Sequence, residues 1–137
     1  MEEVFMKWRP DFNLGISEID KQHRKIVELI NTLSQAFANK TARQKLGDIF
    51  EELLAYADYH FQAEEALFQS SNFPFSEEHI ALHRKFVAKV QDLRQKHQED
   101  KPVTFRVLGF LKDWLTNHIL DADREYAALV KAKTNIK

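Results

Sequence analysis

The apolar residues of this 137-residue chain recur at alternating spacings of three and four positions in four long stretches. This spacing places the apolar side chains along one face of an α-helix. The stretches cover about residues 17–37, 42–69, 76–97 and 102–130, and only short polar or proline-containing segments separate them. We therefore predict an all-α protein whose four helices pack as an up-down-up-down antiparallel bundle.

Each predicted helix contributes one apolar face to the core of the bundle. At position 82 or 83 the spacing does not choose which residue faces inward. The other predicted apolar core residues are Ile16, Ile19, Ile26, Ile30, Leu33, Phe37, Leu46, Phe50, Leu53, Ala57, Leu67, Phe86, Val90, Leu93, Leu108, Leu111, Leu115, Ala122 and Leu129.

Local motifs mark where the first two helices begin. The sequences SEID at 17–20 and TARQ at 41–44 both have the form of a capping box, in which a hydroxyl and an acid or amide three residues later satisfy free backbone groups. The region before the first motif contains proline and glycine and has no helical period. We expect an N-terminal arm at 1–16, a bundle at 17–132 and a single domain over 1–137.

Composition and charge narrow the class of protein. Hydrophobic residues make up 44% of the chain and charged residues 30%, which is typical of a globular protein. The formal net charge of −1 gives no electrostatic case for binding nucleic acid. The absence of cysteine excludes disulfides and thiolate metal sites. No apolar run reaches membrane-spanning length, and no signal peptide is apparent, so we expect a cytoplasmic protein.

Polar residues occupy several positions where the helical period requires a core residue. Burying such a group costs roughly 2–7 kcal/mol unless it finds a partner. A single histidine in an apolar face is usually a satisfied core residue, but five histidines and a glutamate drawn from all four helices favour a metal site. These residues are His23, His60, Glu64, His79, His83 and His118.

The spacing of these residues also suits metal binding. His60 and Glu64 are four residues apart, as are His79 and His83, so each pair projects from one helix face about one turn apart. A second carboxylate near His118 is expected from either Asp121 or Asp123. On a helical wheel these two flank the apolar face at similar angles, and spacing alone does not choose between them. Asp20, one turn before His23, is either a partner of that histidine or an acid in the first helical turn.

Together these motifs resemble the hemerythrin family, and within it the bacterial single-domain branch, the bacteriohemerythrins. Each motif is weak alone, but their order and spacing across nearly the whole chain are specific. The matching segments are Gly15–His23, His60–Glu65, His79–His83 and Trp114–Ile119, with Asp123 beyond.

The resemblance implies a centre of two iron ions joined by an oxo or hydroxo bridge. In that assignment three histidines bind one iron, two bind the other, and two carboxylates bridge both, which favours Asp123 over Asp121. The implied ligands are His79, His83 and His118 for the first iron, His23 and His60 for the second, and Glu64 and Asp123 as bridges. The implied walls of a dioxygen pocket are Phe61, Trp114, Leu115 and Ile119.

Such a ligand set leaves one coordination position open, on the iron with two histidines. The resemblance therefore implies reversible dioxygen binding for carriage, storage or delivery to an oxygen-using enzyme, by a monomer that is not itself an enzyme. The alternatives are a di-iron oxidase or peroxidase, including such a reaction as a weak side activity, and the handling or sensing of iron or nitric oxide. Ferritin-like enzymes use four carboxylates and two Glu-x-x-His motifs, which this chain lacks.

Overall fold

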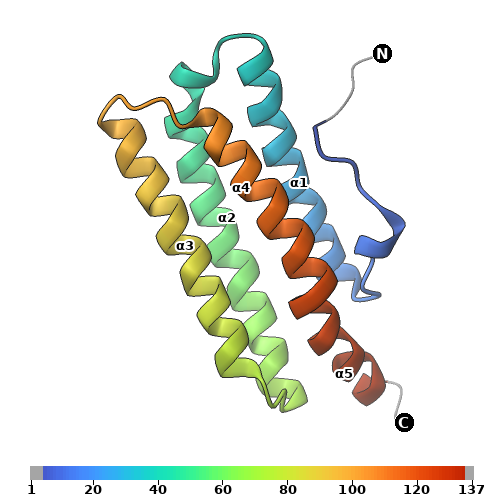
Figure 1. Ribbon diagram of the computed structural model, residues 1–137. Helices are drawn as coiled ribbons and strands as arrows, with labels where there is room; N and C mark the ends of the chain where they lie inside the picture. The colour runs from blue at the N-terminus through green and yellow to red at the C-terminus, as the bar shows by residue number, and fades with distance from the viewer. Residues whose placement is uncertain (1–4, 135–137) are drawn as a thin grey trace.

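The computed structural model describes residues 5–134, which form an antiparallel helical bundle (Figure 1). We call each of the four long helical stretches of the bundle a rod. The fourth rod covers residues 104–134 and is made of three consecutive segments. This arrangement confirms the predicted all-α bundle. The elements are a 3₁₀ turn, η1 (Pro10–Phe12), the helices α1 (Ser17–Ala38), α2 (Ala42–Ser71), α3 (Ser76–Gln98) and α4 (Thr104–Asn117), a π-helical segment, η2 (His118–Asp123), and α5 (Arg124–Thr134).

The helix bounds lie close to the predicted ones, but neither predicted capping box forms. No side chain caps α1 or α2, and the residue before α1 is Ile16 rather than the expected hydroxyl residue. The carboxylate of Asp20 instead accepts hydrogen bonds from the backbone N–H groups of Leu14 at 2.8 Å and Gly15 at 3.1 Å. Asp20 therefore fixes the turn that leads into α1 and forms no hydrogen bond with His23 there.

The predicted core is confirmed for most positions, and one predicted core residue, Phe37, is wrong. Phe37 is 47% exposed because it lies in the last turn of α1, where its ring lies near the exposed ring of Phe105. At the position that the spacing left open, Leu82 is 37% exposed and His83 faces inward, as the metal-site interpretation expected. Beyond η2, Tyr126 is fully buried although the predicted spacing did not include it.

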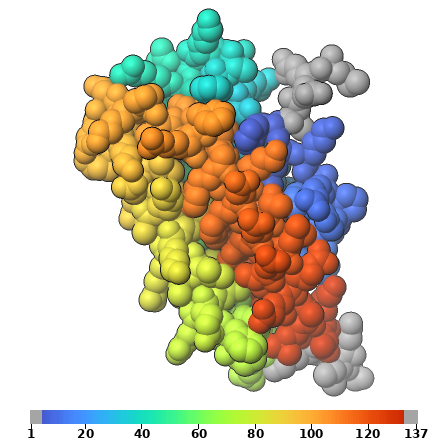
Figure 2. Space-filling view, in the orientation of Figure 1, coloured from blue at the N-terminus to red at the C-terminus, as the bar shows by residue number. Residues whose placement is uncertain are grey.

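The N-terminal arm lies against the bundle, beside the fourth rod (Figure 2). Phe12 and Leu14 are buried in the core, and η1 packs directly against η2. The Asn31 side chain binds both the N–H and the carbonyl of Met6, at 2.8 and 2.9 Å. These contacts tie the arm to α1 and to the π-helical segment. Residues 1–4 of the predicted arm and 135–137 of the predicted domain lie outside the described residues.

The two ends of the bundle differ in character. Because neighbouring helices are antiparallel, the first halves of α1 and α3 lie at the same end as the second half of α2 and segment η2. All the polar core positions predicted from the sequence fall at this end. The opposite end is packed by apolar side chains, among them Leu33, Leu46, Phe50, Val90, Leu93 and Val107. No helix within residues 5–134 is long and apolar enough to cross a membrane.

Candidate metal centre

Seven side chains from all four rods meet in one buried cluster. Each is at most 6% exposed, and most of the other buried residues on the same helical segments are apolar. The structure therefore brings together every residue that the resemblance implied as a ligand. They are His23 on α1, His60 and Glu64 on α2, His79 and His83 on α3, and His118 and Asp123 on η2.

The π-helical segment explains how His118 and Asp123 reach the same cluster. In an α-helix, residues five apart point about 140° away from one another. A π-helix forms hydrogen bonds between residues five apart, so such residues lie nearly one above the other. His118 and Asp123 are the first and last residues of η2, and both are buried, whereas Asp121 is exposed. The helical wheel could not separate the two aspartates because it assumed an unbroken α-helix.

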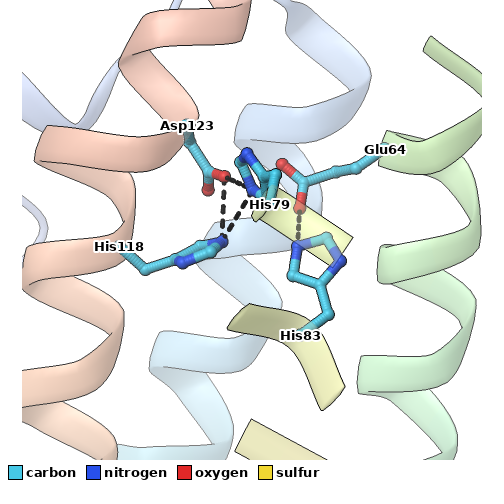
Figure 3. Close-up of side chains that lie close together, drawn as sticks. All are labelled: Glu64, His79, His83, His118 and Asp123. Atoms are coloured by element: carbon cyan, nitrogen blue, oxygen red, sulfur yellow. Dashed lines mark hydrogen bonds and ion pairs between the residues drawn. The ribbon is translucent and has the colours of Figure 1, made fainter. Parts of the chain in front are cut away.

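Five of the side chains form a group around one point (Figure 3). Asp123 Oδ1 lies 2.9 Å from His79 Nε2 and 3.0 Å from His118 Nε2. His83 Nε2 lies 3.2 Å from Glu64 Oε1. One candidate ligand atom from each of these five residues lies within 4.8 Å of all the others. This group contains three imidazoles and two carboxylates.

A second group shares both carboxylates with the first. His23 Nε2 lies 3.0 Å from Asp123 Oδ2, and His60 Nε2 lies 3.3 Å from Glu64 Oε1. The candidate ligand atoms of these four residues also lie within 4.8 Å of one another. The histidines thus fall into sets of three and two around two common carboxylates, which is the division that the resemblance implied.

The cluster contains more lone pairs than hydrogen-bond donors. His79 Nε2 and His118 Nε2 face each other at 3.0 Å. Although the atoms of the cluster lie close together, several of them have no partner with hydrogen-bond geometry among residues 5–134. These atoms include both oxygens of Asp123, both ring nitrogens of His23, and Glu64 Oε1. Buried polar atoms are rarely left in this state without an ion or water. Imidazole nitrogens and carboxylate oxygens are suitable donors for iron and other divalent transition metals, so the residues fit a pair of cations.

The electrostatics of the cluster also favour positive charge. Burial is the largest single influence on the pKa of Glu64 and raises it, and the charge of Asp123 raises it further. The contacts of Glu64 with His60 and His83 outweigh both effects and lower this pKa to about 2. Burial also raises the pKa of Asp123, yet its imidazole neighbours hold it well below the usual value. Burial lowers the pKa of His23, but Asp123 reverses this and leaves it raised. Two ionised carboxylates therefore attract cations into a buried site.

Three residues around the cluster hold its members in place. The hydroxyl of Tyr126 donates a hydrogen bond to Glu64 Oε2 at 2.6 Å. Gln22 and Glu65 contact the outer nitrogens of His60 and His83. Sequence reasoning gave none of the three a role. Gln22 and Glu65 do lie inside the matching motifs, whereas Tyr126 lies beyond them, four residues after the predicted core position Ala122.

The four residues expected to wall a dioxygen pocket lie close to the cluster. The ring of Phe61 stacks on His83, with centroids 3.8 Å apart, and the ring of Trp114 stacks on His118 at 4.2 Å. These two aromatic residues thus contact the group of three histidines. Leu115 and Ile119 are fully buried beside His118 along the chain.

Comparison with known proteins gives one consistent result. Residues 14–130 match the family described as the Hemerythrin HHE cation binding domain. The chain is 35% identical to the Bacteriohemerythrin of Stenotrophomonas maltophilia, over 96% of this chain and 86% of that one. It is 36% identical to a Hemerythrin-like protein of Naegleria gruberi, over 90% and 92%. A crystal structure of wild-type hemerythrin superposes with a TM-score of 0.84 at 29% identity, over 93% of this chain and 98% of that one.

Proposed function

Because the chain belongs to the hemerythrin family, we propose that its buried cluster binds two iron ions and that the loaded protein binds dioxygen reversibly. The observation that carries this proposal is the pair of ligand groups sharing Glu64 and Asp123. Two carboxylates, each facing imidazoles of both groups, are the arrangement that a bridged metal pair requires.

In this proposal the ligands divide as the two groups do. His79, His83 and His118 hold one iron, His23 and His60 hold the other, and Glu64 and Asp123 bridge them. The iron pair would supply the electrons and the coordination position for dioxygen, which side chains cannot supply. Tyr126 holds Glu64 in a single orientation through its hydrogen bond.

Two apolar residues of the fourth rod, Leu115 and Ile119, would protect the site rather than bind metal. Leu115 and Ile119 are buried next to His118, and neither offers a proton or a hydrogen bond. An apolar wall excludes water, and water would promote release of the bound ligand in a reduced form that leaves the iron oxidised. These two residues would therefore protect the oxygenated protein from irreversible oxidation.

A binding protein is favoured over a di-iron enzyme by the chemistry of the donors. The cluster has five imidazoles and only two carboxylates. Carboxylate-rich sites support the more oxidised iron states that cleave dioxygen, and an imidazole-rich site supports them less. Dioxygen as the ligand, the monomeric state and the cytoplasmic location stay predictions.

The test is to load the protein with two equivalents of ferrous iron without air and to measure dioxygen uptake. We expect one dioxygen bound per chain, with a new absorption band that disappears when the oxygen pressure is lowered. Leu115→Ala should hasten the decay of the oxygenated form without changing iron content. Leu108→Ala, a buried leucine of α4 about two turns from Leu115, is the matched control for loss of packing. Turnover of an organic substrate with no reversible uptake would overturn the proposal.

A further inference from the structure

The two histidines that face Glu64 have outer hydrogen-bond partners of different charge. His60 Nδ1 lies 2.7 Å from Gln22 Oε1, whereas His83 Nδ1 lies 3.1 Å from Glu65 Oε2. Amide and carboxylate oxygens accept hydrogen bonds, so each ring carries its proton on Nδ1 and presents the lone pair of Nε2 to the cluster. Both contacts select the same tautomer, one with a neutral acceptor and one with an anion.

The two acceptors also differ in their exposure. Gln22 is 2% exposed, and its Nε2 has no hydrogen-bond partner among residues 5–134. The Glu65 side chain is 34% exposed and borders a cavity of about 280 Å³ between α2 and α3. Burying an amide with an unused donor costs free energy, so a position that only filled space would hold an apolar residue. The amide of Gln22 is therefore explained by its contact with His60.

The charge of the outer acceptor alters how strongly an imidazole donates electrons to a metal. An anionic acceptor draws the Nδ1 proton toward itself and makes Nε2 a stronger donor, while a neutral amide has a smaller effect. A metal with stronger donors has a lower reduction potential and is oxidised more readily. The choice between an amide and a carboxylate therefore sets the redox behaviour of the nearby metal position.

We propose that Gln22 is a positioning residue that fixes the tautomer of His60 and, because it is uncharged, keeps the metal position of two histidines easier to hold reduced than the position beside His83. This inference rests on the proposed function and deepens it. The fold makes the two metal positions unequal through their outer partners as well as through the number of histidines. Loss of electrons without return of dioxygen is thereby slowed at the position held by His60.

The positioning role is tested by nitrogen NMR of the protein loaded with zinc alone, which needs neither iron nor dioxygen. In the wild type we expect His60 to carry a slowly exchanging proton on Nδ1. Gln22→Leu should abolish the slow exchange, while Glu65→Gln should change the His83 signals and leave those of His60 in place. An unchanged His60 signal in Gln22→Leu would overturn the positioning role.

The charge role is tested on the iron-loaded protein with Gln22→Glu. A glutamate at position 22 would accept the hydrogen bond that His60 Nδ1 now donates to the amide, and this bond favours the ionised form of the new carboxyl group. We expect a lower reduction potential and roughly tenfold faster decay of the oxygenated form, within the range typical for changes to such outer partners. The exposed Glu28 lies on the same helix as Gln22, and Glu28→Gln is the control that should change neither quantity.

The outcomes separate this inference from the proposed function. An equal potential in Gln22→Glu and the wild type would overturn the charge role even if dioxygen binds reversibly. A lowered potential in a protein that takes up no dioxygen would support the role of Gln22 and overturn the proposed function. If Gln22→Leu does not fold, both roles are judged from Gln22→Glu. Its reduction potential then tests the charge role, and its His60 NMR signals test the positioning role.

Discussion

Among single residues, two aspartates two positions apart have opposite environments. Asp123 is fully buried and lies about 3 Å from three imidazoles, while Asp121 is exposed and has no contact with the cluster. The difference arises from the backbone of η2, because both residues have the same side chain.

This contrast predicts the result of a pair of alanine substitutions. Asp123→Ala removes a bridge between the two ligand groups and should lower the iron content from two per chain to one or none. Asp121→Ala should retain the wild-type iron content, as expected for an exposed side chain. Elemental analysis of purified proteins measures both. Equal iron in the two variants would mean that Asp123 is not a ligand.

Tyr126 provides a second test at the scale of one residue. Its hydroxyl is buried and donates to an ionised carboxylate, and such bonds contribute about 2 kcal/mol to stability. Tyr126→Phe should lower the free energy of unfolding of the metal-free protein by about that amount, measured by urea denaturation. Tyr59→Phe, at an exposed position, should change it little. The opposite order would show that the bond to Glu64 does not stabilise the fold.

The candidate ligands could be predicted from the sequence because polar residues in apolar faces stand out against the helical period. Five histidines and Glu64 were identified in this way, and the structure brings them together. Asp123 required the family resemblance, since the wheel treated it like Asp121. Gln22 and Tyr126 could not be assigned, because their roles depend on which side chain lies opposite them across the bundle.

At the scale of elements, the four helices were predicted well and the interruption of the last one was not. Apolar spacing reports which residues face inward, so the rods and their approximate bounds follow from it. The spacing does not report a change of backbone hydrogen bonding within a rod. Segment η2 shifts the inward positions by about one residue, so that Asp123 is fully buried where Ala122 was expected to be. The capping box predicted at the start of α1 does not form, because the carboxylate of Asp20 instead binds backbone N–H groups of the N-terminal arm.

The π-helical segment makes a further prediction about the length of the fourth rod. Deleting one residue from a π-turn restores the spacing of four that an α-helix places on one face. Deletion of the exposed Asp121 should therefore keep His118 and the following aspartate on the same face and retain bound iron. Deletion of the exposed Lys112 from the regular helix α4 should rotate His118 and Asp123 together away from the ligands on the other helices and abolish iron binding.

Iron content and circular dichroism of the two deletion variants check this prediction. Both variants remove one exposed residue of the fourth rod, and they differ in whether the deleted residue lies in the π-helical segment or in the regular helix. Loss of iron in both, with helix content kept, would show that the cluster needs the π-geometry itself and not only the shared face.

At the scale of the whole molecule, the cluster affects stability because it gathers like-charged and unpaired groups from all four rods. Two ionised carboxylates lie in the core with several buried atoms that lack hydrogen bonds. A cation bound there satisfies these atoms only in the folded state, so it stabilises that state by mass action.

Removal of metal should therefore lower the melting temperature while leaving the chain helical. We expect the metal-free protein to melt at least several degrees below the loaded protein, followed by circular dichroism at one protein concentration. Adding back iron under reducing conditions should restore the original value. Equal melting of the two forms would indicate that the cluster does not bind metal tightly.

The unequal ends of the bundle bear on the order in which the protein is assembled. The end without candidate ligands is packed by Leu33, Phe50, Leu93 and similar side chains, and its burial of apolar surface needs no ion. That end can associate first and set the register of the four rods, which leaves the ligand end formed but loosely held. Metal then enters a site whose donors are already near one another. In this protein the chain would thus fold before it binds metal. The rate of metal loading would depend on metal supply and on local opening of the ligand end, not on complete refolding.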